Sequence, residues 1–154
     1  RPYEGLDLTP FLPAVESQVS VVDVVPSFLH AAPAQVAAFD PYDRADRYTW
    51  NASWDLPAGK LCNGIAFWFD VDWAPGVTMS TSPSAEGTHW AQALLRVPER
   101  TIAAGDRLEL QIDVDFDEEE TPCYRWSGCY RTADGRAEQP FRRCQDDPYA
   151  HDDE

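Results

Sequence analysis

The sequence predicts an all-β fold: an antiparallel barrel or sandwich of about eight to ten short strands, with a short helical N-terminal segment. Runs of alternating apolar and polar residues recur at intervals of roughly ten residues, which is the spacing of short strands. Turn-forming residues separate these runs, and little helical periodicity is visible. Six Trp, seven Phe and six Tyr among 154 residues suit a single large aromatic core.

The first third of the chain contains short predicted elements. Residues 1–18 predict an irregular or helical segment with apolar anchors. β-Branched residues predict a strand at 19–25, which a proline ends. One helical turn is predicted at 27–31 and a short strand at 35–40. Alternating apolar and polar residues predict the next strand at 48–54.

A long aromatic strand is predicted at 61–73, and the rest of the chain is organised around it. Every second residue from Ile65 to Val71 is a large apolar one, as a half-buried strand requires. A turn at Ala74-Pro75-Gly76 leads to a second strand at 77–81. A loop at 82–87 then precedes the tripeptide Thr88-His89-Trp90.

Three further strands are predicted in the second half. The first covers 91–97 and ends at Pro98 and Glu99. The second, at 108–116, has the cleanest alternation in the chain, with one apolar face and one acidic face. The last covers 123–130. From residue 132 the chain turns polar and acidic, which predicts a mostly disordered tail at 132–154.

The charge of the chain narrows the classes of partner. Twenty-seven acidic and 12 basic residues give a formal net charge of −15. Such a surface repels nucleic acid and anionic membrane, and it favours a basic partner such as an Arg-rich protein. No apolar run approaches the ~20 residues of a membrane-spanning helix, and no signal peptide is visible. The location that we expect is cytoplasmic, nuclear or both.

The four cysteines, Cys62, Cys123, Cys129 and Cys144, leave three interpretations open. Thiols that form no disulfide are the first, and a Cys123–Cys129 bridge is the second. A metal site is the third, because no Cys-x-x-Cys pair occurs. The formal glycosylation sequon at Asn51-Ala52-Ser53 matters only in a secreted chain.

Three motifs follow one another in the middle of the chain: Phe69-Asp70-Val71-Asp72-Trp73, Met79-Ser80-Thr81-Ser82-Pro83 and Thr88-His89-Trp90. In order and spacing they resemble the C-terminal barrel of the protein arginine N-methyltransferases, in which the Thr-His-Trp loop is a signature. Tyr3-Glu4-Gly5-Leu6-Asp7-Leu8 also resembles part of that family's dimerisation arm, with a frayed terminus as the alternative. The resemblance implies an arm remnant at 1–18, a β-barrel domain at 19–131 and a tail at 132–154.

The resemblance also implies a site. Thr88, His89 and Trp90 would line the pocket that the substrate arginine enters. His89 would orient a carboxylate of the methyltransferase half and so support catalysis, Trp90 would wall the pocket, and Thr88 would hold the loop backbone. The parent enzyme would be a homodimer acting on an Arg-rich protein substrate.

The cofactor of the parent enzyme would be S-adenosylmethionine, which a Rossmann-like domain binds through a Gly-rich turn. This chain contains no Gly-x-Gly sequence, and its acidic run Glu118-Glu119-Glu120 does not match the family's arginine-binding glutamates. We therefore expect no cofactor site and no metal site in this chain, and no activity from the chain alone.

Other classes remain open on the residues alone. One is a β-sandwich module that binds a peptide or carbohydrate through Trp50, Trp54 and Trp73. Another is a secreted domain held together by disulfides. Within the resemblance, a non-catalytic regulatory paralogue is a further alternative.

Overall fold

The computed structural model describes residues 9–39, 45–85, 90–117 and 121–145. The prediction of a mostly β fold with antiparallel sheets and a short N-terminal helix is confirmed. The strands are β1 (Ser20–Val22), β2 (Arg47–Asp55), β3 (Leu61–Phe67), β4 (Asp70–Ala74), β5 (Val77–Ser80), β6 (Gln92–Thr101), β7 (Arg107–Phe116), β8 (Pro122–Arg131) and β9 (Ala137–Cys144). The helix is α1 (Leu12–Glu16), and two 3₁₀ turns are η1 (Thr9–Phe11) and η2 (Pro26–Phe28). The described strands do not close into a barrel.

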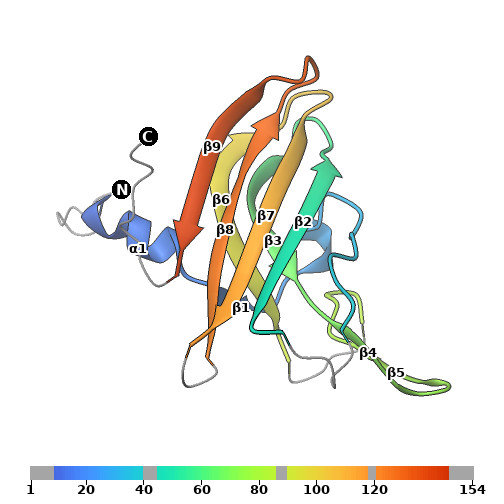
Figure 1. Cartoon of the computed structure of the whole chain (residues 1–154). Coiled ribbons are helices and arrows are strands. Elements are labelled where there is room, and N and C mark those ends of the chain that lie inside the picture. The colour runs from blue at the N-terminus through green and yellow to red at the C-terminus, as the bar shows by residue number, and fades with distance from the viewer. Residues whose placement is uncertain (1–8, 40–44, 86–89, 118–120, 146–154) are drawn as a thin grey trace, which may run out of the picture.

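Two sheets face each other and enclose the core (Figure 1). The front sheet has the strand order β2-β7-β8-β9, and the sheet behind it has the order β1-β6-β3. The alternation predicted for β7 is confirmed, because its inward residues are at most 3% exposed. Those inward residues are Leu108, Leu110, Ile112 and Val114. They pack with Trp126, Tyr130 and Phe141 of the same sheet and with Leu95 and Val97 of β6.

Two aromatic side chains of β8 bridge the sheets with their polar tips. The indole N–H of Trp126 donates to the carbonyl of Arg96 at 2.8 Å, and the hydroxyl of Tyr130 donates to the carbonyl of Pro98 at 2.8 Å. Both acceptors lie on β6. Burying the polar group of a Trp or Tyr is costly unless it finds such a partner, so these bonds fix β8 against β6.

The long strand predicted at 61–73 is in fact two strands, and this prediction is wrong. β3 ends at Phe67 and pairs with β6, whereas β4 begins at Asp70 and pairs with β5. At the break, the N–H of Phe69 donates to the hydroxyl of Thr81 at 3.1 Å, and its carbonyl accepts from the Thr81 N–H at 3.0 Å. The β4–β5 hairpin therefore leaves the sandwich and extends away from it (Figure 1).

The predicted end of the next strand at Pro98 is also wrong, because β6 continues beyond this residue. Along β6 the pairing moves from Arg96 to Arg100 while β3 advances only from Gly64 to Cys62. The surplus residues form an irregularity around Pro98. A proline has no N–H to give to a ladder, and a bulge is one of the few places where a sheet accepts it.

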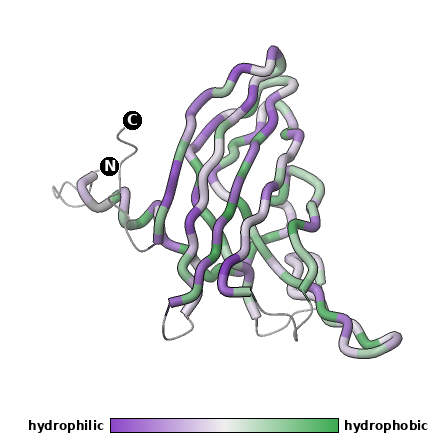
Figure 2. The backbone as a smooth tube through the Cα atoms, viewed as in Figure 1, coloured by the Kyte–Doolittle hydropathy of each residue, from purple (hydrophilic) through white to green (hydrophobic). Residues whose placement is uncertain are grey.

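The disordered tail predicted from residue 132 is wrong for Ala137–Cys144, which form β9. β9 pairs antiparallel with β8 and completes the front sheet. Phe141 is 5% exposed in the core, although Figure 2 shows the strand as mainly hydrophilic. Gln139 has a φ of 49° beside an irregularity in the pairing with β8. A single buried aromatic in a polar run gives no alternation strong enough to predict a strand.

The remaining short elements agree with the prediction in part. The strands at 19–25 and 48–54 are present as β1 and β2, and the helical turn at 27–31 is present as η2. The prediction of a strand at 35–40 is wrong for its described residues, 35–39, which are irregular. The predicted arm motif at 3–8 lies outside the described residues.

The cysteines form no disulfide, and all four lie within the described residues. The second interpretation, a Cys123–Cys129 bridge, is excluded by geometry. Both residues belong to β8, six positions apart, which corresponds to about 20 Å along an extended strand. A disulfide requires Cα atoms within about 7 Å of each other.

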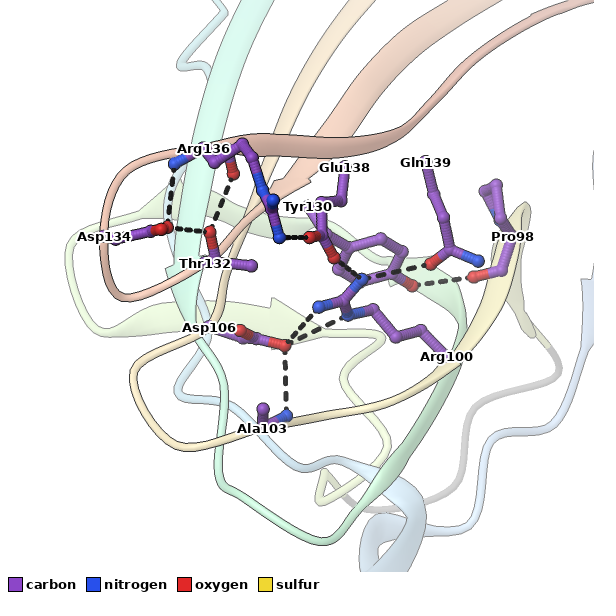
Figure 3. Close-up of polar contacts among 10 residues, drawn as sticks. All are labelled: Pro98, Arg100, Ala103, Asp106, Tyr130, Thr132, Asp134, Arg136, Glu138 and Gln139. Carbon is purple, nitrogen blue, oxygen red and sulfur yellow. Dashed lines mark hydrogen bonds and ion pairs between the residues drawn. The ribbon is translucent and has the colours of Figure 1, made fainter.

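An ion-pair network closes the end of the sandwich at which β6 ends (Figure 3). The guanidinium of Arg100 lies 3.0 Å from a carboxylate oxygen of Asp106 and 2.9 Å from one of Glu138. It also lies 5.3 Å from the ring centroid of Tyr130. Asp106 is 2% exposed and also accepts the N–H of Ala103 at 3.0 Å. The network joins β6, β8, β9 and the turn before β7.

The network shifts the pKa values of its members. The hydrogen bond from Arg100 is the largest cause that lowers the pKa of Glu138. The same bond is the largest cause that raises the pKa of Arg100. Burial raises the pKa of the Tyr130 hydroxyl above its ordinary value.

We expect the network to make stability depend on acid pH. The pKa of Glu138 is lower in the folded chain than in the unfolded chain. Its contribution is therefore complete above the unfolded value, about 4.3, and is lost as the pH falls through the folded value. Urea unfolding of Glu138→Gln should show a smaller loss of unfolding free energy below about pH 5 than the wild type. Parallel pH profiles for the two proteins would contradict this.

Candidate functional site

Of the three residues predicted to form a site, the structure describes Trp90. Thr88 and His89 lie outside the described residues. Trp90 comes two residues before β6 begins and is 45% exposed. Its ring packs edge-on against the ring of Phe69, with centroids 5.1 Å apart and planes at 60°. The tripeptide therefore leads into the start of β6, where Trp90 contacts the residue at the β3–β4 break.

Two further exposed aromatic side chains belong to the β3–β4 break and the β4–β5 hairpin. Phe69 is 40% exposed, and Trp73 on the hairpin is 67% exposed. Asp70 and Asp72 are exposed on the same hairpin. Aromatic faces next to carboxylates can bind a cationic side chain, because the ring quadrupole and the negative charge both attract it. The five residues Phe69, Asp70, Asp72, Trp73 and Trp90 offer rings and negative charge of the kinds that attract an arginine or lysine, and these five include no nucleophile paired with a base.

The ion-pair network around Arg100 is separate from these five residues. Gln92 and Arg100 lie at opposite ends of β6, which places them about 25 Å apart for a strand of that length. Every charged member of the network has a protein partner. We therefore assign Arg100, Asp106 and Glu138 a structural role.

Nothing in the described residues fits a nucleotide-type cofactor or a metal ion. All of the strand pairs are antiparallel, and α1 has only five residues. A Rossmann-like site needs parallel strands joined by crossover helices, with the ligand at the carboxyl ends of the strands. The described residues also contain no group of three His, Cys, Asp or Glu side chains placed to hold a metal. No helix among them is long and apolar enough to span a bilayer.

The alternative of a carbohydrate- or peptide-binding module depended on three tryptophans. Trp50 and Trp54 are partly buried and pack against the core, so of the three only Trp73 is exposed. A shallow groove of about 470 Å³ crosses the outer face of β2, β7 and β8. It is lined by residues such as Asn51 and Ser127 and contains no aromatic residue. The stacking surface that this alternative needs is therefore absent from the groove.

Two buried polar residues beside the loop were missed by sequence reasoning. Thr81 is 2% exposed and Gln92 is 7% exposed. They stand immediately before and after the segment 82–91, which contains Trp90. The prediction used Thr81 as the end of a strand and as part of the motif Met79-Ser80-Thr81-Ser82-Pro83, and it did not single out Gln92 within the strand at 91–97. Polar residues predicted on strands are normally expected to face solvent, so their burial could not be foreseen from the pattern.

These observations define the chain as a two-sheet antiparallel β domain with exposed aromatic residues at one end and no nucleotide-binding fold among its described residues. The family model described as "Arginine methyltransferase oligomerization subdomain" matches residues 3–130. The chain belongs to this family, and the resemblance stated from its motifs is confirmed. β9 lies beyond the matched residues.

Relatives of known structure share the fold. A chain of the Trypanosoma brucei PRMT1 enzyme–prozyme heterotetrameric complex with AdoHcy superimposes with a TM-score of 0.75 at 19% identity, covering 92% of this chain and 49% of that chain. Protein arginine methyltransferase 10 of Arabidopsis thaliana gives a TM-score of 0.71 at 19% identity, covering 92% and 48%. This chain therefore spans about half the length of these solved chains.

Curated relatives match a shorter segment. The histone-arginine methyltransferase CARMER of Drosophila erecta is 46% identical over 41 residues, which are 25% of this chain and 8% of that protein. The probable histone-arginine methyltransferase CARMER of Drosophila melanogaster matches with the same figures.

Proposed function

We propose that this chain is the substrate-cleft and oligomerisation half of an S-adenosylmethionine-dependent protein arginine N-methyltransferase. The match of the oligomerization subdomain model to residues 3–130 supports this most directly. Trp90, exposed and packed on Phe69, is the described residue of the site that we propose for this chain. The cofactor, when bound, supplies the methyl group. It would be held by a separate methyltransferase half, because no described residue set here fits it.

Each residue of the predicted tripeptide has a proposed role. Trp90 forms one wall of the pocket and packs against the aliphatic and planar parts of the arginine side chain. His89 orients a carboxylate of the methyltransferase half, which in turn holds the guanidinium. Thr88 supports the loop backbone. None of these groups performs methyl transfer by itself, so this half would act by positioning the substrate.

The net charge indicates the kind of substrate, and the family model indicates the kind of subunit partner. Charge complementarity favours an Arg-rich protein substrate, because the net charge of −15 attracts basic chains and repels acidic ones. We propose a homodimer of the complete enzyme, in line with the name of the oligomerization subdomain. We also propose that the enzyme acts in the cytoplasm or nucleus, where Arg-rich substrates occur.

Methyl transfer to a histone-like Arg-rich peptide tests this function. We expect no labelled product from the chain alone, and product when the chain is combined with a methyltransferase half of the family. In the combined enzyme, Trp90→Ala should lower kcat/KM at least about tenfold, which is the loss of about 1.4 kcal/mol of transition-state binding. Phe28→Ala is the control, since Phe28 is an aromatic residue, 71% exposed, outside the tripeptide and outside the surface around Phe69, and it should leave kcat/KM within about twofold. Transfer by the chain alone, or equal effects of both variants, would refute the proposal.

A non-catalytic regulatory subunit is a second candidate. Its support is the similarity to a chain from a complex described as enzyme–prozyme. In that case, the chain should raise the activity of a complete methyltransferase when added to it, and Trp90→Ala should not reduce this stimulation. A stimulation that disappears with Trp90→Ala would favour the substrate-cleft function instead.

A further inference from the structure

Two buried polar side chains flank the segment that contains Trp90. The segment 82–91 leaves the β4–β5 hairpin at Thr81 and returns to the sandwich at Gln92, the first residue of β6. Buried polar groups are uncommon and need partners. The partners of these two side chains therefore indicate what holds the ends of the segment.

Thr81 attaches the start of the segment to the β3–β4 break. Its backbone N–H donates to the carbonyl of Phe69 at 3.0 Å. Its hydroxyl accepts from the Phe69 N–H at 3.1 Å and lies 3.2 Å from the same carbonyl, to which it can donate. Both backbone polar groups of Phe69 are thus held by one residue. Because the Phe69 ring contacts the Trp90 ring, this attachment also places the surface on which Trp90 rests.

Gln92 joins the two ends of the segment to each other. Its side-chain N–H donates to the carbonyl of Thr81 at 2.8 Å. Its side-chain oxygen accepts the backbone N–H of Val24 at 2.8 Å, although Val24 is 68 positions away in the sequence. The amide therefore bonds simultaneously to the residue before the segment and to the chain that follows β1. Only a side chain with a donor and an acceptor at its tip can make both bonds.

We infer that Gln92 is a positioning residue. Together with Thr81 it joins the chain before the segment 82–91 to the chain after it, and so it holds Trp90 against Phe69. The importance of this for the binding of arginine rests on the proposed function, whereas the clamp itself does not. The buried amide restrains the chain at both ends of the segment, so Trp90, two residues before Gln92, is already held against Phe69 before the substrate arrives. Positioning residues contribute to catalysis in this way, because they lower the entropy that is lost when the substrate is oriented.

The clamp is tested on the chain itself by two readouts. In Gln92→Met, which keeps length and apolar volume but removes both bonds, the Val24 amide should exchange its hydrogen at least about tenfold faster, while the amide of Ile112 in β7 should be unchanged. The indole N–H resonance of Trp90, assigned by its loss in Trp90→Phe, should shift. Gln111→Met is the matched control because Gln111 is exposed on β7, and it should change neither readout.

A second variant, which removes only one of the two bonds, keeps the test decisive if Gln92→Met does not fold. Gln92→Glu retains the acceptor for Val24 but loses, when ionised, the donor for Thr81. It should shift the Trp90 resonance at neutral pH with little change at the Val24 amide. An unchanged Trp90 resonance in a folded Gln92 variant would overturn the inference.

The kinetic consequence separates the two proposals. In the enzyme formed with a methyltransferase half, Gln92→Met should lower kcat/KM for the arginine peptide about tenfold, with the Kd of S-adenosylmethionine unchanged. An equal loss in cofactor binding, or no loss in kcat/KM, would overturn the positioning role. Absence of transfer by the wild-type combination would instead count against the proposed function and would leave the clamp to be decided by hydrogen exchange and the Trp90 resonance.

Discussion

Replacement of Arg100 by methionine is expected to destabilise the folded chain by about 3–5 kcal/mol. The reason is Asp106, whose side chain is 1% exposed and whose carboxylate contacts the Arg100 guanidinium at 3.0 Å. Methionine approximates the length of the arginine stem but leaves this carboxylate buried without its counter-charge. The N–H of Ala103 remains as a hydrogen-bond donor, but it cannot replace a full positive charge.

Urea unfolding at neutral pH measures this effect, with Arg107→Met as the control. Arg107 also makes an ion pair at 2.8 Å, but its partner Asp55 has a side chain that is 83% exposed. Water solvates such a pair well, so the control should cost no more than about 1 kcal/mol. The double variant with Arg100→Met and Asp106→Leu should recover part of the loss, because it removes both charges. Similar costs for Arg100→Met and Arg107→Met would show that Asp106 does not depend on Arg100.

The position of this network explains how the domain can be rigid and still expose a site. Arg100 and Gln92 stand at opposite ends of the same strand. At one end, Arg100 forms ion pairs with β9 and with the turn before β7 and lies over the Tyr130 ring of β8, while the other end of the strand follows the hairpin and Trp90. Stability and substrate contact are therefore provided by different residues. Arg100→Met should accordingly reduce stability without shifting the Trp90 indole resonance.

The parts of the fold that the sequence predicted are those in which one strand face is consistently buried. In β7, each inward residue is apolar and each outward neighbour is polar, so alternation and burial coincide. The break at Phe69 was not predictable in this way. Alternation continues through it, and the break is held by two hydrogen bonds between the backbone of Phe69 and Thr81, twelve residues later, one to the Thr81 hydroxyl and one from its N–H. Local pattern contains no information about such a change of partner.

In the candidate site, too, some residues could be predicted from the sequence and others could not. Trp90 was found because it belongs to a recognisable motif. Gln92 belongs to no motif used in the prediction, and its importance depends on Val24 and Thr81, which approach it only in the folded chain. Long-range hydrogen bonds of a single buried amide have no signature in the periodicity of a sequence.

The last prediction tests whether β9 belongs to the folded domain. Phe141→Ala is expected to cost about 3–5 kcal/mol, because the ring is 5% exposed within the core cluster and its loss leaves a cavity. The ring faces Gly128 on β8, where an added Cβ would come within 3.0 Å of it, so the neighbouring strand has no side chain to fill the space.

Phe28→Ala is the matched control, since this phenylalanine is 71% exposed on η2, and it should change the unfolding free energy by about 0.5 kcal/mol or less. Both variants are compared with the wild type by urea unfolding. A loss of several kcal/mol confined to Phe141→Ala would establish that the domain extends beyond the residues matched by the family model. Equal, small effects would mean that β9 adds little to the core. β9 also brings Glu138 to Arg100. If β9 adds little, Glu138→Gln should leave the unfolding free energy at acid pH unchanged.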